Sequence, residues 1–108
     1  MNKVKAFVEF LEDKKAEKVT VLDLRFTSSI QDYAIIAEAG NPRLLGALKD
    51  YCLEYGSTLD YKVHHVEGHN ESEWLLIDFD TLVIHLFLSQ SRQFYRLEDL
   101  WLDKIIKL

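Results

Sequence analysis

The stretch LLIDFDTLVIHLF, residues 75–87, consists of two apolar runs on either side of a short segment that contains two aspartates. Apolar runs of this length that are bounded by turn residues are typical of strands. We therefore expect an antiparallel hairpin whose turn lies at residues 78–81, where Asp is favoured because its side chain accepts hydrogen bonds from the nearby backbone. Since the two runs are almost wholly apolar, they predict strands that are buried on both faces of a sheet.

Helical patterns precede and follow the hairpin. Residues 3–15 carry apolar side chains at helical spacing, which predicts an amphipathic helix. A second helix is expected to begin at Pro42, with Asn41 as its N-cap, and to be closed by Gly56. A third helix is expected over residues 89–108, with an apolar side made of Phe94, Leu97, Trp101, Ile105 and Leu108.

Three further strands complete the pattern. They are expected at residues 19–24, 33–39 and 59–68, with a turn cluster at residues 28–32. The resulting order is α-β-β-α-β-β-β-α. It predicts an α/β fold in which a mixed β-sheet of about five strands packs with about three helices around one core.

Length and composition indicate one cytoplasmic domain that spans residues 1–108. Apolar residues make up 48% of the chain, and the single cysteine, Cys52, leaves no internal disulfide. The first residues lack the small-residue cleavage site of a signal peptide, and no apolar run approaches the ~20 residues of a membrane span. We therefore expect no membrane partner.

The net charge of −5 argues against nucleic acid as the main partner, because proteins that neutralise phosphates carry a basic excess. An acidic domain associates more readily with a basic protein. The composition therefore favours a basic protein partner over direct nucleic-acid recognition.

Asp78 and Asp80 have an alternative interpretation as metal ligands of a small metal-dependent nucleotidyltransferase-like enzyme. Their spacing places both carboxylates on one face of a strand. Such a site also needs a glycine-rich phosphate loop, which the sequence lacks, and usually a third carboxylate. Asp23, the candidate third acid on a strand, lies far away along the chain. We therefore favour the turn over the metal site.

The histidines and the cysteine do not form a recognisable metal or catalytic motif either. His64, His65 and His69 cluster around one expected strand, and His85 lies in another, but their spacing matches no zinc motif. We expect a structural role for His85, with its hydrogen bonds satisfied. Cys52 lies on the inner side of the second helix and is expected to be a core residue.

Aromatic residues gather in the last third of the chain. Phe87, Phe94 and Trp101 are expected to be core residues. Trp74 follows a polar loop and Tyr95 neighbours two arginines, and Trp, Tyr and Arg dominate protein-binding hot spots. Nearby acidic residues suit a basic protein partner, and they are Glu67, Asp78, Glu98 and Asp99.

Three stretches resemble the ribosomal silencing factor (Iojap) family. They are VLDLRFTSSIQDYAIIAEAG at residues 21–40, EGHNESEWLLIDFDTLVIHLF at residues 67–87 and RQFYRLEDLW at residues 92–101. The family motifs that they carry are Asp-Leu-Arg, Asp-Tyr, Glu-Gly, Trp-x-x-x-Asp and His-x-Phe, followed by Arg-x-Phe-Tyr-x-Leu-Glu-x-Leu-Trp. The resemblance covers the chain from Lys18 to Trp101.

The resemblance implies a non-enzymatic factor with a nucleotidyltransferase-like fold that lacks the catalytic motif. Members bind the large ribosomal subunit at its conserved fourteenth protein, on the face that meets the small subunit. They block joining and repress translation when nutrients are scarce. No cofactor or metal is implied, and a homodimer is expected. The partner-binding residues that the matched motifs imply are Glu67, Trp74, Asp78, Tyr95, Leu97, Glu98 and Trp101.

Overall fold

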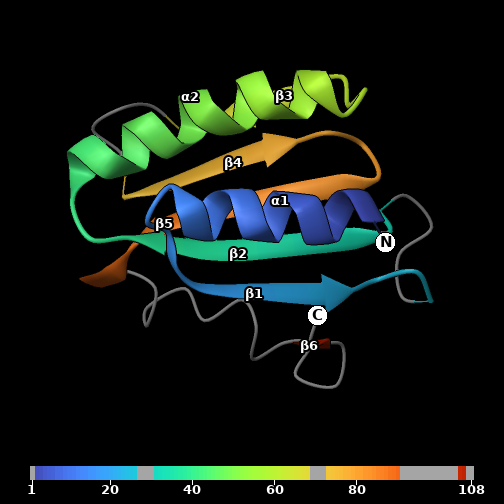
Figure 1. Cartoon of the computed structure of the whole chain (residues 1–108), viewed down its shortest axis with the longest axis horizontal. Coiled ribbons are helices and arrows are strands. Elements are labelled where there is room, and N and C mark those ends of the chain that lie inside the picture. The colour runs from blue at the N-terminus through green and yellow to red at the C-terminus, as the bar shows by residue number, and fades with distance from the viewer. Residues whose placement is uncertain (1, 27–30, 69–72, 91–104, 107–108) are drawn as a thin grey trace.

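The structure is a computed structural model that describes residues 2–26, 31–68, 73–90 and 105–106. Two helices and six strands lie within these residues (Figure 1). Their bounds are α1 Asn2–Asp13, β1 Glu17–Asp23, β2 Tyr33–Ala39, α2 Pro42–Thr58, β3 His65–Glu67, β4 Trp74–Asp78, β5 Leu82–Leu88 and β6 Ile105–Ile106.

The strands form one mixed sheet in the order β3-β4-β5-β2-β1-β6. The central pair, β2 and β5, is parallel, and the other neighbouring pairs are antiparallel. Both helices lie against the same face of this sheet (Figure 1). The predicted class, a mixed sheet packed with helices, is confirmed.

The main core lies between the helices and the sheet. Val4, Phe7 and Leu11 of α1 are buried there, and so are Leu45 and Leu48 of α2. A smaller apolar cluster lies on the opposite face and comprises Leu22, Leu24, Ala34, Ile36 and Phe87, with Trp74 packed against it. Every residue of β2 is buried, and so is every residue of β5 except His85, which confirms the expected burial on both faces for the second run of the hairpin. The expectation is wrong for the first run, because buried and half-buried residues alternate along β4.

The start of α2 follows the predicted capping chemistry. The Asn41 side chain accepts a hydrogen bond from the backbone N–H of Leu44 at 2.8 Å, and Pro42 occupies the first turn. The predicted end of the helix at Gly56 is wrong, because α2 continues to Thr58. Gly56 instead allows close packing, since a Cβ there would lie 2.6 Å from Cζ of Phe79.

Two other predicted elements also differ. The strand expected at residues 59–68 is restricted to β3, because the backbone N–H of Tyr61 bonds back to the Gly56 carbonyl and Asp60 has a φ of 66°. The third helix is wrong at Ile105–Ile106, which pair as β6 with Val21 and Leu22. The edge of β1 offers backbone groups that need partners, and a short strand supplies them. Residues 91–104 of that predicted helix lie outside the described residues.

Candidate partner-binding face

The hairpin turn between β4 and β5 uses Asp78 as a backbone acceptor. Its Oδ1 accepts a hydrogen bond from the N–H of Asp80 at 2.7 Å, and the N–H of Phe79 donates to the carbonyl of Leu82 at 2.8 Å. Asp80 has a φ of 77°, a conformation that Asp tolerates in turns. Phe79 anchors the turn because its ring is buried in the main core. The turn prediction is confirmed.

The nucleotidyltransferase alternative gains no support from the geometry. Asp23, the candidate third acid, forms an ion pair with Arg25 at 2.8 Å, which accounts for the Asp-Leu-Arg motif. The chain does contain one Gly-Ser pair, Gly56-Ser57, but this pair lies inside α2 and therefore forms no phosphate loop. Among the residues that the structure describes, no group of three His, Cys, Asp or Glu side chains could hold a metal ion.

Strand pairing brings three of the predicted partner-binding residues to one face of the sheet. Trp74, Leu76 and Asp78 alternate with buried residues along β4, so they lie opposite the helices. Glu67 pairs with Leu76 and His65 pairs with Asp78, so these two β3 residues share that face. We call His65, Glu67, Trp74, Leu76 and Asp78 the β3–β4 face.

The exposure of these side chains suits a contact surface. Glu67 is exposed, and Trp74 and Asp78 are half-buried. Nε2 of His65 lies 2.9 Å from Oε1 of Glu67, and both side chains are about half exposed. A contact between two such exposed side chains contributes little to folding, so both groups are available to a partner.

Trp74 packs with His85 and Phe87 in a cluster of three rings. The ring centroids of Trp74 and His85 are 6.2 Å apart, and those of His85 and Phe87 are 6.5 Å apart, with interplanar angles of 18° and 11°. Burial lowers the pKa of His85 to about 4, so the imidazole is neutral at physiological pH. His85 is therefore a packing residue of this cluster, which confirms the expected structural role. The expectation that its hydrogen bonds are satisfied is wrong, because its Nδ1 is buried without a hydrogen-bond partner among the described residues.

Of the remaining residues singled out in the sequence, Cys52 lies in the part of the chain that the structure describes. Cys52 is buried in the core as expected, and burial raises the pKa of its thiol to about 12. The other predicted partner-binding residues lie outside the described residues, and they are Tyr95, Leu97, Glu98 and Trp101. His69 lies outside them as well.

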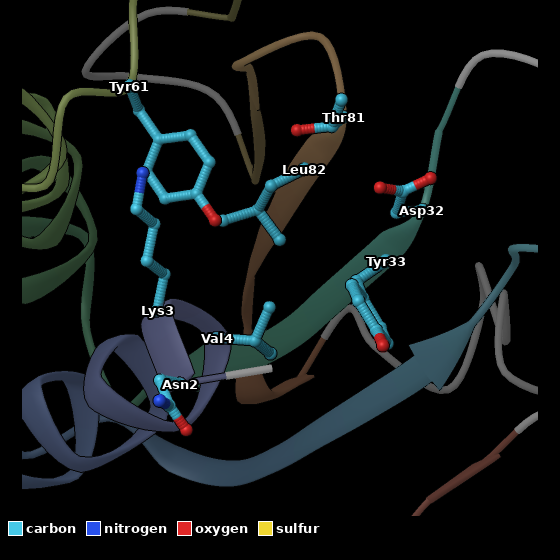
Figure 2. A pocket seen from close by; sticks show the side chains of 8 residues that line it. All are labelled: Asn2, Lys3, Val4, Asp32, Tyr33, Tyr61, Thr81 and Leu82. Atoms are coloured by element: carbon cyan, nitrogen blue, oxygen red, sulfur yellow. The ribbon is translucent and has the colours of Figure 1, made fainter.

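A hollow that the sequence did not reveal lies where α1, β2 and the start of β5 meet (Figure 2). It has a volume of about 410 Å³, and its polar side chains include Lys3, Asp32, Tyr61 and Thr81. These residues come from four separate segments of the chain and form no motif. Their proximity could have been found from the strand pairing, which joins Tyr33 to Leu82.

The fold and this face define a class: a small mixed α/β domain with an acidic and aromatic sheet face. No helix among the described residues is long and apolar enough to cross a membrane. A family profile described as "Ribosomal silencing factor during starvation" matches residues 1–107. The chain belongs to this ribosomal silencing factor family.

Individual relatives agree with this assignment. The ribosomal silencing factor RsfS of Halalkalibacterium halodurans is 30% identical over 96 residues, which cover 89% of this chain and 82% of that protein. A mouse protein named mitochondrial assembly of ribosomal large subunit protein 1 is 30% identical over 97 residues, which are 87% of this chain and 42% of that protein.

Solved structures agree as well. A crystal structure of a Bacillus halodurans protein superposes with a TM-score of 0.84 at 26% identity and covers 99% of this chain and 98% of that one. A crystal structure of a Chromobacterium violaceum protein superposes with a TM-score of 0.81 at 30% identity and covers 87% of this chain and 78% of that one.

Proposed function

We propose that this protein is a cytoplasmic, non-enzymatic ribosomal silencing factor. It binds the large ribosomal subunit at its conserved fourteenth protein, blocks joining with the small subunit, and thereby represses translation under nutrient limitation. The observation that carries this proposal is the family match over residues 1–107, whose description names silencing during starvation. The mouse relative, whose name refers to assembly of the large subunit, supports that subunit as the partner. When free, the protein is a homodimer.

The β3–β4 face is the contact surface in this proposal. Trp74 supplies a large aromatic side chain held in place by His85, and rigid aromatic anchors contribute strongly to interfaces. Glu67 and Asp78 place carboxylates beside it on the same face. The resemblance in sequence adds the residues of the last motif, which are Tyr95, Leu97, Glu98 and Trp101.

Charge supports a protein-directed contact. The chain has a net charge of −5, so it attracts a basic ribosomal protein and is repelled by ribosomal RNA. Two carboxylates on the contact face increase the association rate, and salt screens this effect. Association should therefore slow as the salt concentration rises.

The mechanism needs no chemical step. The domain measures 34 × 31 × 23 Å, and a body of this size on the joining surface prevents the small subunit from approaching. Silencing follows when the factor, through its affinity and its concentration, occupies the large subunit more often than the small subunit does. No cofactor or metal takes part in this mechanism.

The experiment is co-sedimentation of the protein with purified large subunits in a sucrose gradient. Trp74→Ala should weaken binding at least about tenfold, because hot-spot aromatics contribute about 2 kcal/mol or more. Tyr51→Ala is the matched control, since Tyr51 is an exposed aromatic on α2, against the other face of the sheet. Equal co-sedimentation of the two variants, both folded by circular dichroism, would contradict the proposed contact face.

The carboxylates need charge variants that preserve the fold. Asp78→Asn keeps an oxygen that can accept the hydrogen bond from the Asp80 N–H, so the turn should persist. Combined with Glu67→Gln, it removes two negative charges from the β3–β4 face. We expect slower association at low salt and convergence with the wild type at high salt. The same effect from Glu54→Gln, a charge on α2, would show that net charge, and not this face, is responsible.

A further inference from the structure

The hollow between α1, β2 and the start of β5 has two walls of opposite charge (Figure 2). Lys3 and Tyr61 lie on one side, and Asp32 and Thr81 lie on the other, with the side chains of Val4 and Leu82 between them. Val4 and Leu82 are core residues that are 2% and 1% exposed, so they close the bottom of the hollow as a narrow apolar floor. This hollow plays no part in the proposed contact with the ribosome.

Contacts within the protein hold the Tyr61 ring on one wall of the hollow and the backbone of the opposite wall. The Lys3 Nζ lies over the Tyr61 ring, 5.3 Å from its centroid, and the Tyr61 ring packs on buried Phe79 with centroids 5.4 Å apart. The backbone N–H of Asp32 donates to the Thr81 carbonyl at 2.7 Å. The side chains of Lys3, Asp32 and Thr81 are exposed, so a ligand can reach them from the solvent.

Neither charge is neutralised by an ion pair within the described residues. Lys3 contacts the Tyr61 ring, and neither Lys3 nor Asp32 forms a salt bridge with a described residue, although the positive charge of Arg25 interacts with Asp32 at longer range. Burial, and secondly the charge of Asp32, raise the pKa of Tyr61, so its hydroxyl stays protonated and can donate. The hollow thus offers one cation, one anion and hydroxyl groups on separate walls.

The size and charge of the hollow restrict the ligand. Its volume of about 410 Å³ lies near the lower end of the roughly 300–1,000 Å³ that small-molecule sites occupy. A nucleotide or dicarboxylate would bring excess negative charge towards Asp32, and a polyamine would bring positive charge towards Lys3. A small zwitterion satisfies both walls through charge-assisted hydrogen bonds.

We propose that this hollow binds a free α-amino acid with an apolar side chain. Its carboxylate meets Lys3, its ammonium group meets Asp32 and Thr81, and its side chain covers the floor of Val4 and Leu82. The Thr81 carbonyl belongs to the turn that begins at Asp78, so the occupied site adjoins the end of the β3–β4 face. Binding itself does not require the ribosome.

The first test is calorimetry of the whole protein with L-leucine, L-isoleucine, L-valine, L-methionine or L-phenylalanine. We expect a dissociation constant below about 1 mM for at least one of them. Glycine should bind more weakly than these five, because it does not contact the apolar floor. No binding of any of the five amino acids up to about 10 mM would overturn the proposal.

The second test assigns each charge with matched ligands. 4-Methylpentanoate lacks the ammonium group of leucine, and 3-methylbutylamine lacks its carboxylate, so each should bind the wild type at least tenfold more weakly than leucine. Asp32→Asn should weaken leucine binding tenfold but leave 4-methylpentanoate binding unchanged, and Lys3→Gln should do the same for leucine and 3-methylbutylamine. Loss of folding cannot produce this crossed pattern.

Control variants separate the hollow from general charge effects. Asp50→Asn and Lys5→Gln remove exposed charges from α2 and α1 at positions that do not line the hollow. Both should bind leucine as the wild type does. Equal weakening by these controls, or leucine binding that survives both Asp32→Asn and Lys3→Gln, would overturn the proposal.

Discussion

Lowering the pH from about 7.5 to about 5 is expected to destabilise the fold through His85. Burial against Trp74 and Phe87 lowers the pKa of His85 from 6.5 to about 4, whereas the unfolded chain keeps the ordinary value. Between these two values the unfolded state binds the proton and the folded state does not. The free energy of unfolding therefore falls as the pH decreases through this window.

The size of the effect follows from the two pKa values. At about pH 7.5 His85 is neutral in the folded and the unfolded state, so its protonation contributes almost nothing to the free energy of unfolding there. At about pH 5 the unfolded state is largely protonated and the folded state largely neutral, which costs the fold about 2 kcal/mol. His85→Phe removes the titrating group and keeps a flat ring beside Trp74 and Phe87. The variant should lack this part of the pH dependence.

Urea unfolding of the wild type and His85→Phe at the two pH values measures this difference. Exposed groups, including His64 and His65, are common to both proteins and cancel in the comparison. We expect the wild type to lose about 2 kcal/mol more than the variant. The same loss in both proteins would refute the assignment of a buried neutral imidazole. His85→Leu provides a second comparison if the Phe variant alters the packing.

Three further predictions concern α2. Gly56→Ala should lower the free energy of unfolding by about 1 to 2 kcal/mol in urea titrations, because the added Cβ would meet the buried Phe79 ring. This loss exceeds the gain from the better helix propensity of Ala. An unchanged stability would contradict this packing. Asn41→Ala should cost about 1 kcal/mol by thermal unfolding through loss of the bond to the Leu44 N–H, and Asn41→Asp should restore the cap. The Cys52 thiol, with its pKa raised to about 12, should react with a disulfide reagent in urea and not in the folded protein.

Local chemistry explains which parts of the fold were predictable from the sequence. The N-cap at Asn41 and the hydrogen bond of Asp78 within its turn each depend on residues only a few positions apart. β2 was predicted with its observed bounds, because a run of apolar residues ends at Gly40. Patterns of this kind survive folding, since the neighbours that determine them are fixed by the covalent chain.

Contacts between distant segments account for the rest. Gly56 resembles a helix terminator in the sequence. Its actual role is to leave room for the ring of Phe79, the residue that directly follows β4. Two residues are too few to show alternation, so β6 could be recognised only from the open edge of β1. The hollow at Lys3 and Asp32 likewise depends on strand pairing that no single motif records.

For the candidate contact face, the resemblance in sequence named Glu67, Trp74 and Asp78 but could not say whether they meet. The antiparallel register of β3 and β4 places them on one face. Alternation along β4 was enough to place Trp74 and Asp78 together, whereas the position of Glu67 required the register, which the sequence does not specify.

Subunit joining in the presence of the protein tests the central claim most directly. Purified large and small ribosomal subunits are mixed at a magnesium concentration that favours joining, with increasing amounts of the protein, and are then separated on sucrose gradients. We expect joined ribosomes to decrease while the protein sediments with the free large subunits. Undiminished joining at a saturating excess, with no protein in the large-subunit fraction, would contradict it.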